Sequence, residues 1–346
     1  MSNTAPRARW LLASTILMAF AGAAHASPVD TTLYFTTYNG GGRDVWKTTA
    51  TYAGNGTAGN GTFSPGTATN IAATPGADGI VLNPNNKQLL VGGQGTGNIY
   101  QVNPGNGAYI ALSAGMNTYE VTVDPSHDVV WGGGSEGNTV TFTSVPIHPA
   151  GGAPTVATAH LASGAPISIT HLTFVAGQAA GTAFYTSGGD SGGGSFGTID
   201  LATGRVTPIF TNVKYAHGMV YDPFTGDLII SGGNELAQIN PATDAVVSTG
   251  LFGADVLDQG AVDGNGNLYW ADNNGNLLYI NYSTTKLIGS PSNFVSNTFY
   301  MPQLDDFAPL VGAGGTNNNT TVPEPATLAL MGLGFAGLSW ARRRKS

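Results

Sequence analysis

Residues 219–233 read MVYDPFTGDLIISGG, an apolar run, a turn, a second apolar run and a pair of glycines. Each run is too short for a stable helix and is rich in the Val, Ile and Tyr residues that favour strands. The PFTGD segment between them holds Pro, Gly and Asp, which are residues of tight turns. The stretch therefore predicts an antiparallel hairpin whose second strand ends in small residues.

Equivalent pairs of apolar runs recur along the chain, at residues 80–93, 121–133, 172–189, 219–233 and 260–272. Matching positions in successive copies are 41, 51, 47 and 41 residues apart. Two more short strands are expected in each copy, around turns such as those at residues 199–206 and 239–246. Four strands in about 40–50 residues are typical of one blade of a β-propeller.

The two ends of this region complete the pattern. Residues 33–37 predict a second strand without a first, and residues 304–310 predict a first strand without a second. Joining them closes the ring and removes its open edges. We therefore predict an all-β, six-bladed β-propeller over residues 31–311, closed by pairing of N- and C-terminal strands. A sandwich of immunoglobulin type is the alternative fold, but it lacks a period of about 40 residues.

Composition limits the chemistry of this body. Charged residues make up 9% of the 346 residues, against roughly 25% in ordinary soluble domains. Cysteine is absent, which excludes disulfides, a thiol nucleophile and a cysteine-ligated metal. Residues 27–322 contain six Lys and Arg against nineteen Asp and Glu, a net charge of −13. Such a body repels phosphate backbones, so we expect no nucleic-acid partner and a preference for divalent cations.

The N-terminal residues 1–26 predict a signal peptide. Arg7 and Arg9 precede an apolar run at residues 10–22, and Ala24-His25-Ala26 has the small-x-small pattern that signal peptidase cleaves. An N-terminal membrane anchor is the alternative, but the apolar run is short for a membrane span.

The C-terminal residues form a second set of signals. Residues 312–321 are Gly, Thr and Asn rich, which predicts a flexible linker. The motif Val322-Pro323-Glu324-Pro325 follows, held extended by its prolines. Residues 326–341 carry no charge and, as a hydrophobic helix, would reach about 24 Å, slightly less than a ~30 Å bilayer core. A basic cluster on the cytoplasmic side ends the chain: Arg342, Arg343, Arg344 and Lys345.

A Pro-Glu-Pro motif, an apolar helix and a terminal basic cluster, in this order, resemble the PEP-CTERM sorting signal. The resemblance covers residues 322–346 and implies a Gram-negative bacterium that makes exopolysaccharide. It also implies that the protein passes through the inner membrane, where an exosortase processes it near Pro323-Glu324-Pro325. The mature protein would then reach the cell surface or the extracellular matrix.

Polar residues occupy comparable positions at the starts of the predicted innermost strands, near one mouth of the central channel. Ca²⁺ would suit carboxylates, and Zn²⁺ would favour a His pair. The blade sequences resemble those of the NHL, YVTN and gluconolactonase-like propellers, and the last of these hold a divalent metal in this region. Their ligand motif has no residue-by-residue match here, and the alternative is that these groups cap strand starts and hold water. The candidate metal ligands are Asp78, Glu120, His171, His217, Asp258 and Asp305.

No catalytic residue is predicted. Residues 189–193 read GDSGG, like the nucleophile motif of chymotrypsin-like proteases, but that family's Cys and His motifs are absent. Our hypothesis is a non-enzymatic binding or scaffold module whose partner is an exopolysaccharide or a surface protein. The alternative is a metal-dependent hydrolase or lactonase that works at the acidic mouth of the channel.

Overall fold

The computed structural model describes residues 29–37, 44–126, 128–134, 140–148, 152–189, 193–253 and 256–308. All of them lie in one compact unit, Pro28–Asn317. They form strands and turns, and none of them lies in a helix long and apolar enough to cross a membrane. The predicted signal peptide, linker, sorting motif and hydrophobic C-terminal helix lie outside the described residues.

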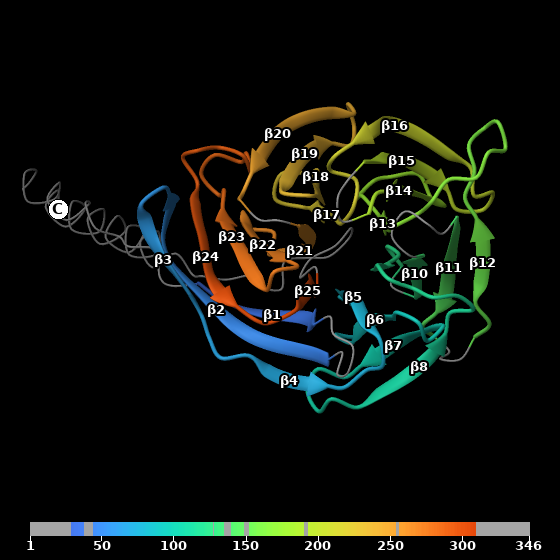
Figure 1. The fold of residues 1–346 in the computed structure, drawn as a ribbon, viewed down its shortest axis with the longest axis horizontal. Helices are drawn as coiled ribbons and strands as arrows, with labels where there is room; N and C mark the ends of the chain where they lie inside the picture. Colours follow the sequence, from blue (N-terminus) through green and yellow to red (C-terminus); the bar gives the residue numbers. More distant parts are fainter. Residues whose placement is uncertain are drawn as a thin grey trace, which may run out of the picture. The chain divides into compact units, whose positions relative to one another are not determined.

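Four separate sheets of four antiparallel strands follow one another along the chain, and in Figure 1 they surround a common centre. The first strand of each sheet lies innermost. The first sheet holds β5 (Ala77–Leu82), β6 (Leu89–Gly93), β7 (Asn98–Val102) and β8 (Tyr109–Ser113). The second holds β9 (Val121–Val123), β10 (Val129–Gly133), β11 (Thr141–Pro146) and β12 (Thr155–Thr158). The third holds β13 (His171–Thr173), β14 (Thr182–Thr186), β15 (Gly194–Asp200) and β16 (Val206–Val213). The fourth holds β17 (Met219–Asp222), β18 (Asp227–Gly232), β19 (Glu235–Asn240) and β20 (Ala245–Leu251).

The other strands form one nine-stranded sheet, in which strands from both ends of the body pair. Phe35 lies opposite Phe307 and Thr37 opposite Leu304, so the predicted pairing of N- and C-terminal strands is confirmed. The members are β21 (Leu257–Val262), β22 (Asn267–Asp272), β23 (Asn276–Asn281), β24 (Phe294–Tyr300), β25 (Leu304–Phe307), β1 (Val29–Thr37), β2 (Asp44–Thr57), β3 (Asn60–Pro65) and β4 (Thr69–Ala72).

The prediction of six blades was wrong in its count. The structure has four separate blades and the nine-stranded sheet, within an all-β, propeller-like fold. The physical reason is one parallel pair, Gln259 opposite Asp306, which joins β21 to β25. This pair merges the strands that were expected to form a fifth blade with those expected to close the ring.

Hydrophobic side chains fill the spaces between neighbouring sheets. One cluster unites Val220 and Ile229 of the fourth sheet with Leu268 and Trp270 of the nine-stranded sheet, all of them at most 2% exposed. Apolar residues on both faces of the sheets explain why the inner strands read as continuous apolar runs rather than as alternating patterns. The sheets are therefore held to one another by packing of side chains, without disulfides.

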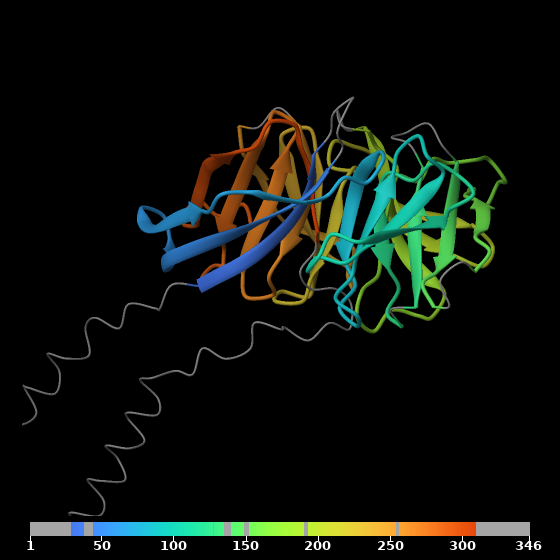
Figure 2. The same cartoon turned by 90° about the horizontal axis from the view of Figure 1, so that it is seen from below.

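The tip of the β2–β3 hairpin connects the N-terminal strands of the nine-stranded sheet (β1–β4) with its C-terminal strands (β21–β25). Figure 2 shows this hairpin beside the strands that end the body. Ala58 N donates a hydrogen bond to Ser292 O at 2.8 Å, and Thr284 Oγ1 donates one to Asn55 O at 3.1 Å. Between them, the Phe63 ring stacks on Tyr279 with ring centroids 4.1 Å apart. The hairpin therefore acts as a clasp across the joint between the two chain ends.

Gly56→Ala should lower the free energy of unfolding by about 2 kcal/mol, because Gly56 sits in the clasp with φ of +78°. A Cβ at this position would lie 2.5 Å from Asn281 Oδ1. Gly59→Ala is the matched control, since its φ is +72° but a Cβ there meets nothing within 4 Å. Chemical denaturation of both variants separates backbone strain from loss of the clasp. Equal losses of unfolding free energy in the two variants would show that only backbone strain matters and that the contacts of the clasp add no stability.

Candidate functional site

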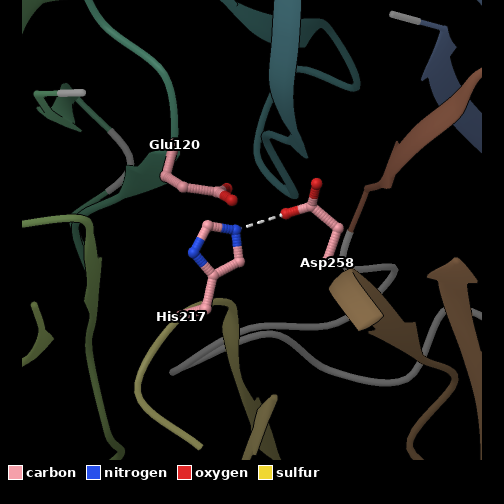
Figure 3. A group of neighbouring side chains, drawn as sticks. All are labelled: Glu120, His217 and Asp258. Atoms are coloured by element: carbon pink, nitrogen blue, oxygen red, sulfur yellow. Dashed lines mark hydrogen bonds and ion pairs between the residues drawn. The ribbon is translucent and has the colours of Figure 1, made fainter. Parts of the chain in front are cut away.

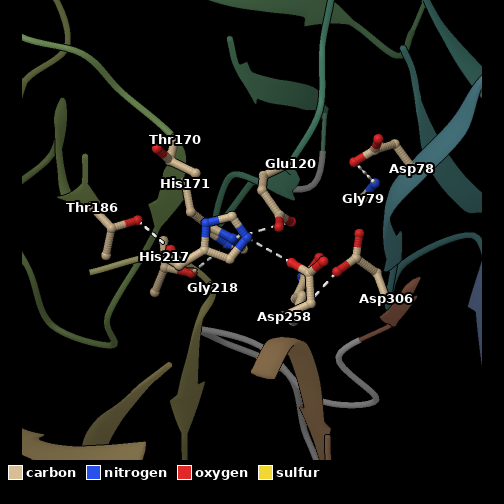
Figure 4. A network of polar contacts seen from close by, with 12 residues as sticks. Asp78, Gly79, Glu120, Thr170, His171, Thr186, His217, Gly218, Asp258 and Asp306 are labelled. Atoms are coloured by element: carbon tan, nitrogen blue, oxygen red, sulfur yellow. Dashed lines mark hydrogen bonds and ion pairs between the residues drawn. The ribbon is translucent and has the colours of Figure 1, made fainter. Parts of the chain in front are cut away.

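All six candidate ligand residues lie at the inner ends of the sheets, where the structure brings them together. Figure 4 labels all of them except Asp305. Asp78 and Asp258 belong to the innermost strands β5 and β21, and Asp305 belongs to β25. Glu120 immediately precedes β9, His217 lies two residues before β17, and His171 is the first residue of β13. Each of the six residues is at most 8% exposed. We call this group, together with Asp306, the axial cluster.

Glu120, His217 and Asp258 form the first part of the axial cluster. One ligand atom of each lies within 4.8 Å of the others, and Figure 3 shows the three side chains converging from different parts of the chain. His217 Nε2 lies 2.7 Å from Asp258 Oδ1, and His217 Nδ1 lies 3.3 Å from the carbonyl oxygen of Gly188. Two carboxylates and one imidazole are thus held by three different sheets.

The contact between His217 and Asp258 needs a proton or a cation between its two atoms. A carboxylate only accepts, so at 2.7 Å either Nε2 carries a hydrogen and donates it to Asp258 Oδ1, or a cation is bound by both atoms. With a cation on Nε2, the hydrogen of the neutral ring would move to Nδ1, which faces the Gly188 carbonyl. That carbonyl also accepts a hydrogen bond from Thr170 Oγ1 at 2.7 Å.

Asp78, Asp305 and Asp306 form the second part, again with ligand atoms within 4.8 Å of one another. Asp306 Oδ1 accepts a hydrogen bond from Gln259 N at 3.1 Å. Burial is the main cause that raises the pKa of Asp306 well above its usual range, and the surrounding carboxylates add to it. Without a cation, this environment therefore favours the protonated, uncharged form of the carboxyl group.

Positive charge in the axial cluster is scarce. Burial, followed by the neighbouring His217, lowers the pKa of His171 to about 3, although Asp258 opposes this change. His171 is therefore neutral at pH 7, with Nδ1 3.3 Å from Glu120 Oε2. Among the described residues, no Lys or Arg is buried. Five buried carboxyl groups thus face at most one imidazolium.

The donor set fits a divalent cation. One His nitrogen with two carboxylate oxygens resembles the three protein ligands of zinc sites that keep a position open, whereas the all-oxygen second part would suit Ca²⁺. With a cation on Nε2, His217 Nδ1 would donate to the Gly188 carbonyl 3.3 Å away, which is the outer contact that usually orients a metal-binding imidazole. The alternative to a metal site, in which these groups cap strand starts and hold water, involves the same residues.

Two members of the site were not among the predicted metal ligands. Asp306 was visible beside Asp305, at the start of the same strand, but only Asp305 was chosen. Gly188 contributes a backbone carbonyl, for which the side-chain sequence carries no direct signal. The GDSGG segment, whose middle residues 190–192 lie outside the described part, leads from β14 and includes Gly188's neighbour Gly189.

The fold places this chain in the class of all-β, propeller-like proteins. A chain in the crystal structure of the nidogen/laminin complex is 12% identical, with a TM-score of 0.59 over 81% of this chain and 98% of that one. A Bacteroides thetaiotaomicron protein of unknown function is 13% identical, with a TM-score of 0.50 over 80% of this chain and 84% of that one. A candidate gluconolactonase has a TM-score of 0.48 at 12% identity, over 67% and 81% of the two chains. At such identities the likeness concerns the fold alone.

The C-terminal residues say more about this particular chain. The family model of the PEP-CTERM protein-sorting motif matches residues 321–345. The motif indicates an exported protein that an exosortase processes and that is sorted to the cell surface. No curated protein matches the chain at a significant level.

Proposed function

We propose that this exported protein works at the cell surface or in the polysaccharide matrix as a non-enzymatic binding or scaffold module that holds a divalent cation at its axis. The observation that carries the proposal is the convergence of Glu120, His217 and Asp258, with His217 oriented by the Gly188 carbonyl. A cation here replaces the proton that the 2.7 Å contact would otherwise need. It also offsets part of the repulsion among the buried carboxylates.

The proposed cation has a structural task. Its three ligands come from the segments that begin the second sheet, the fourth sheet and the nine-stranded sheet. Bound to all three, the cation links sheets that otherwise meet mainly through packed side chains. The partner in the matrix, an exopolysaccharide or another surface protein, would then bind elsewhere on this stabilised body.

The burial of the axial cluster supports binding rather than hydrolysis. A lactonase would need its substrate to reach the cation and its ligands, yet Glu120, His217 and Asp258 are only 3%, 2% and 6% exposed. The metal-dependent hydrolase is the second candidate because the same residues would serve it. Turnover of lactones or sugar esters by the cation-loaded protein would favour that candidate.

Removal of the cation should destabilise the protein. At a free cation concentration about 100 times Kd, binding stabilises the folded state by about 2.7 kcal/mol. For a body of this size, that corresponds to a rise in Tm of roughly 5–10 °C. The measurement is thermal unfolding after EDTA treatment and after addition of Zn²⁺, Ca²⁺ or Mg²⁺, combined with elemental analysis of the purified protein. Identical melting curves under all conditions, with no bound metal, would remove the proposed cation.

A further inference from the structure

The backbones of His217 and Asp258 are each held by a hydroxyl group from the sheet that precedes them in the chain. Thr186 Oγ1, at the end of β14, donates a hydrogen bond to the carbonyl oxygen of His217 at 2.5 Å. Ser231 Oγ, near the end of β18, donates one to the carbonyl oxygen of Asp258. Both hydroxyl-bearing side chains are fully buried. Figure 4 shows Thr186 on the opposite side of His217 from Asp258.

Thr186 and Ser231 occupy the same place in their sheets. The Thr186 carbonyl accepts a hydrogen bond from Thr170 N, and the Ser231 carbonyl accepts the equivalent one from His217 N, just before the innermost strand of each sheet. The second sheet has Gly133 at the corresponding end of its second strand, where a Cβ would collide with the carbonyl oxygen of Thr170. Close approach to the next sheet at this position is therefore shared with the second sheet. A hydroxyl that donates to the next sheet is found where the third sheet meets the fourth and where the fourth meets the nine-stranded sheet. These are the interfaces next to the hydrogen-bonded His217–Asp258 pair.

Further contacts fix the same two residues. Gly188 N donates to the carbonyl oxygen of Ala216 at 2.6 Å, and the Gly188 carbonyl lies 3.3 Å from His217 Nδ1. The end of β14 and the residues after it therefore hold His217 by its backbone and by its ring. On the other side of the pair, Trp270 Nε1 also donates to the Asp258 carbonyl, at 2.7 Å. Asp258 thus has two side-chain donors on one carbonyl oxygen.

We propose that Thr186 and Ser231 are positioning residues of the axial site, which fix the backbones of His217 and Asp258 so that Nε2 faces Oδ1. This inference rests on the proposed function for its link to cation binding, but the positioning itself concerns only the His217–Asp258 contact. Thr186 has the larger effect, because Trp270 still holds the Asp258 carbonyl when the Ser231 hydroxyl is removed. If Thr186 only filled space, removal of its hydroxyl would lower stability without changing the environment of the His217 ring.

The test compares Thr186→Val, which keeps the shape and removes the hydroxyl, with Thr186→Ser, which keeps the hydroxyl. Thr143→Val is the matched control, since Thr143 is equally buried and its Oγ1 donates to the carbonyl oxygen of Ala114 at 2.8 Å, away from the axial cluster. The readouts on the full-length protein are the ring ¹⁵N chemical shifts of His217 without added cation, the Kd for Zn²⁺, and the Tm.

We expect Thr186→Val to change the His217 ring signals and to weaken Zn²⁺ binding about tenfold, as outer contacts of metal ligands do. Thr186→Ser should restore both, and Thr143→Val should lower only the Tm. Unchanged His217 signals in Thr186→Val would overturn the proposal. If the wild type binds no Zn²⁺, the proposed cation site fails, whereas the ring signals still decide the positioning role. If Thr186→Val does not fold, Ser231→Ala gives the same decision through a smaller change in the His217 signals.

Discussion

Replacing Pro323, Glu324 and Pro325 by alanine should leave nearly all of the protein in the inner membrane instead of at the cell surface. These three residues are the Pro-Glu-Pro core of the matched sorting motif, so we expect their loss to prevent processing by the exosortase. Without cleavage, we expect the uncharged residues 326–341 and the basic cluster that follows to keep the tail in the membrane. Cell fractionation with detection of the body, and the mass of the released form, measure the effect.

A double replacement of Asn319 and Thr320 by alanine is the control for the tail. These residues lie in the adjoining linker, before the matched residues 321–345, and their replacement should leave processing unchanged. Release of the Pro-Glu-Pro variant with wild-type mass and yield would show that the motif does not direct sorting. Loss of release in the linker control would instead point to a requirement for the length or sequence of the linker.

The positions of the strands could be predicted because a hairpin is specified locally. The runs around Met219 and Ile230, with turn residues between them, contain the information needed for β17 and β18. The merging of two expected blades could not be predicted in this way, because it depends on a single pair between Gln259 and Asp306. The clasp was also missed, since the Gly- and Thr-rich residues near Gly56 have no apolar period and its contacts join segments far apart in the sequence.

The axial cluster shows the same division between local and distant information. Aligned repeats place Asp78, His217 and Asp258 at equivalent strand starts, and equivalent positions around one axis must lie near each other. The contacts that give the site its chemistry could not be predicted from the sequence. The Gly188 carbonyl that orients His217 is a backbone group, and the Thr186 hydroxyl is one of many in a Thr-rich chain. A sequence repeat predicts which residues lie near one another, but not which atoms form hydrogen bonds with them.

Asp258→Asn should make the protein more stable than the wild type without a cation, but less stable than the wild type with one. In the absence of a cation, the side-chain amide introduced at position 258 can donate to Nε2 of a neutral His217 ring or accept from it, whichever ring nitrogen carries the hydrogen. The substitution also removes one negative charge from a cluster of buried carboxyl groups. We therefore expect the variant to be more stable than the wild type in EDTA, by about 1 kcal/mol or more.

With the cation present, the same substitution should be harmful. An amide oxygen is a weaker ligand than a carboxylate, so we expect affinity to fall by roughly 100-fold, which removes about 2.7 kcal/mol of stabilisation. Asp263→Asn is the matched control: Asp263 is also buried, but it accepts hydrogen bonds from Asn265 and Asn267 and lies outside the axial cluster. This control should lose about 1–3 kcal/mol equally with and without cation, because an amide nitrogen cannot accept those bonds. Denaturation of both variants in EDTA and in Zn²⁺ gives the comparison. If Asp258→Asn instead loses the same stability in both conditions, His217 and Asp258 are a proton-bridged pair, and the axis holds no cation.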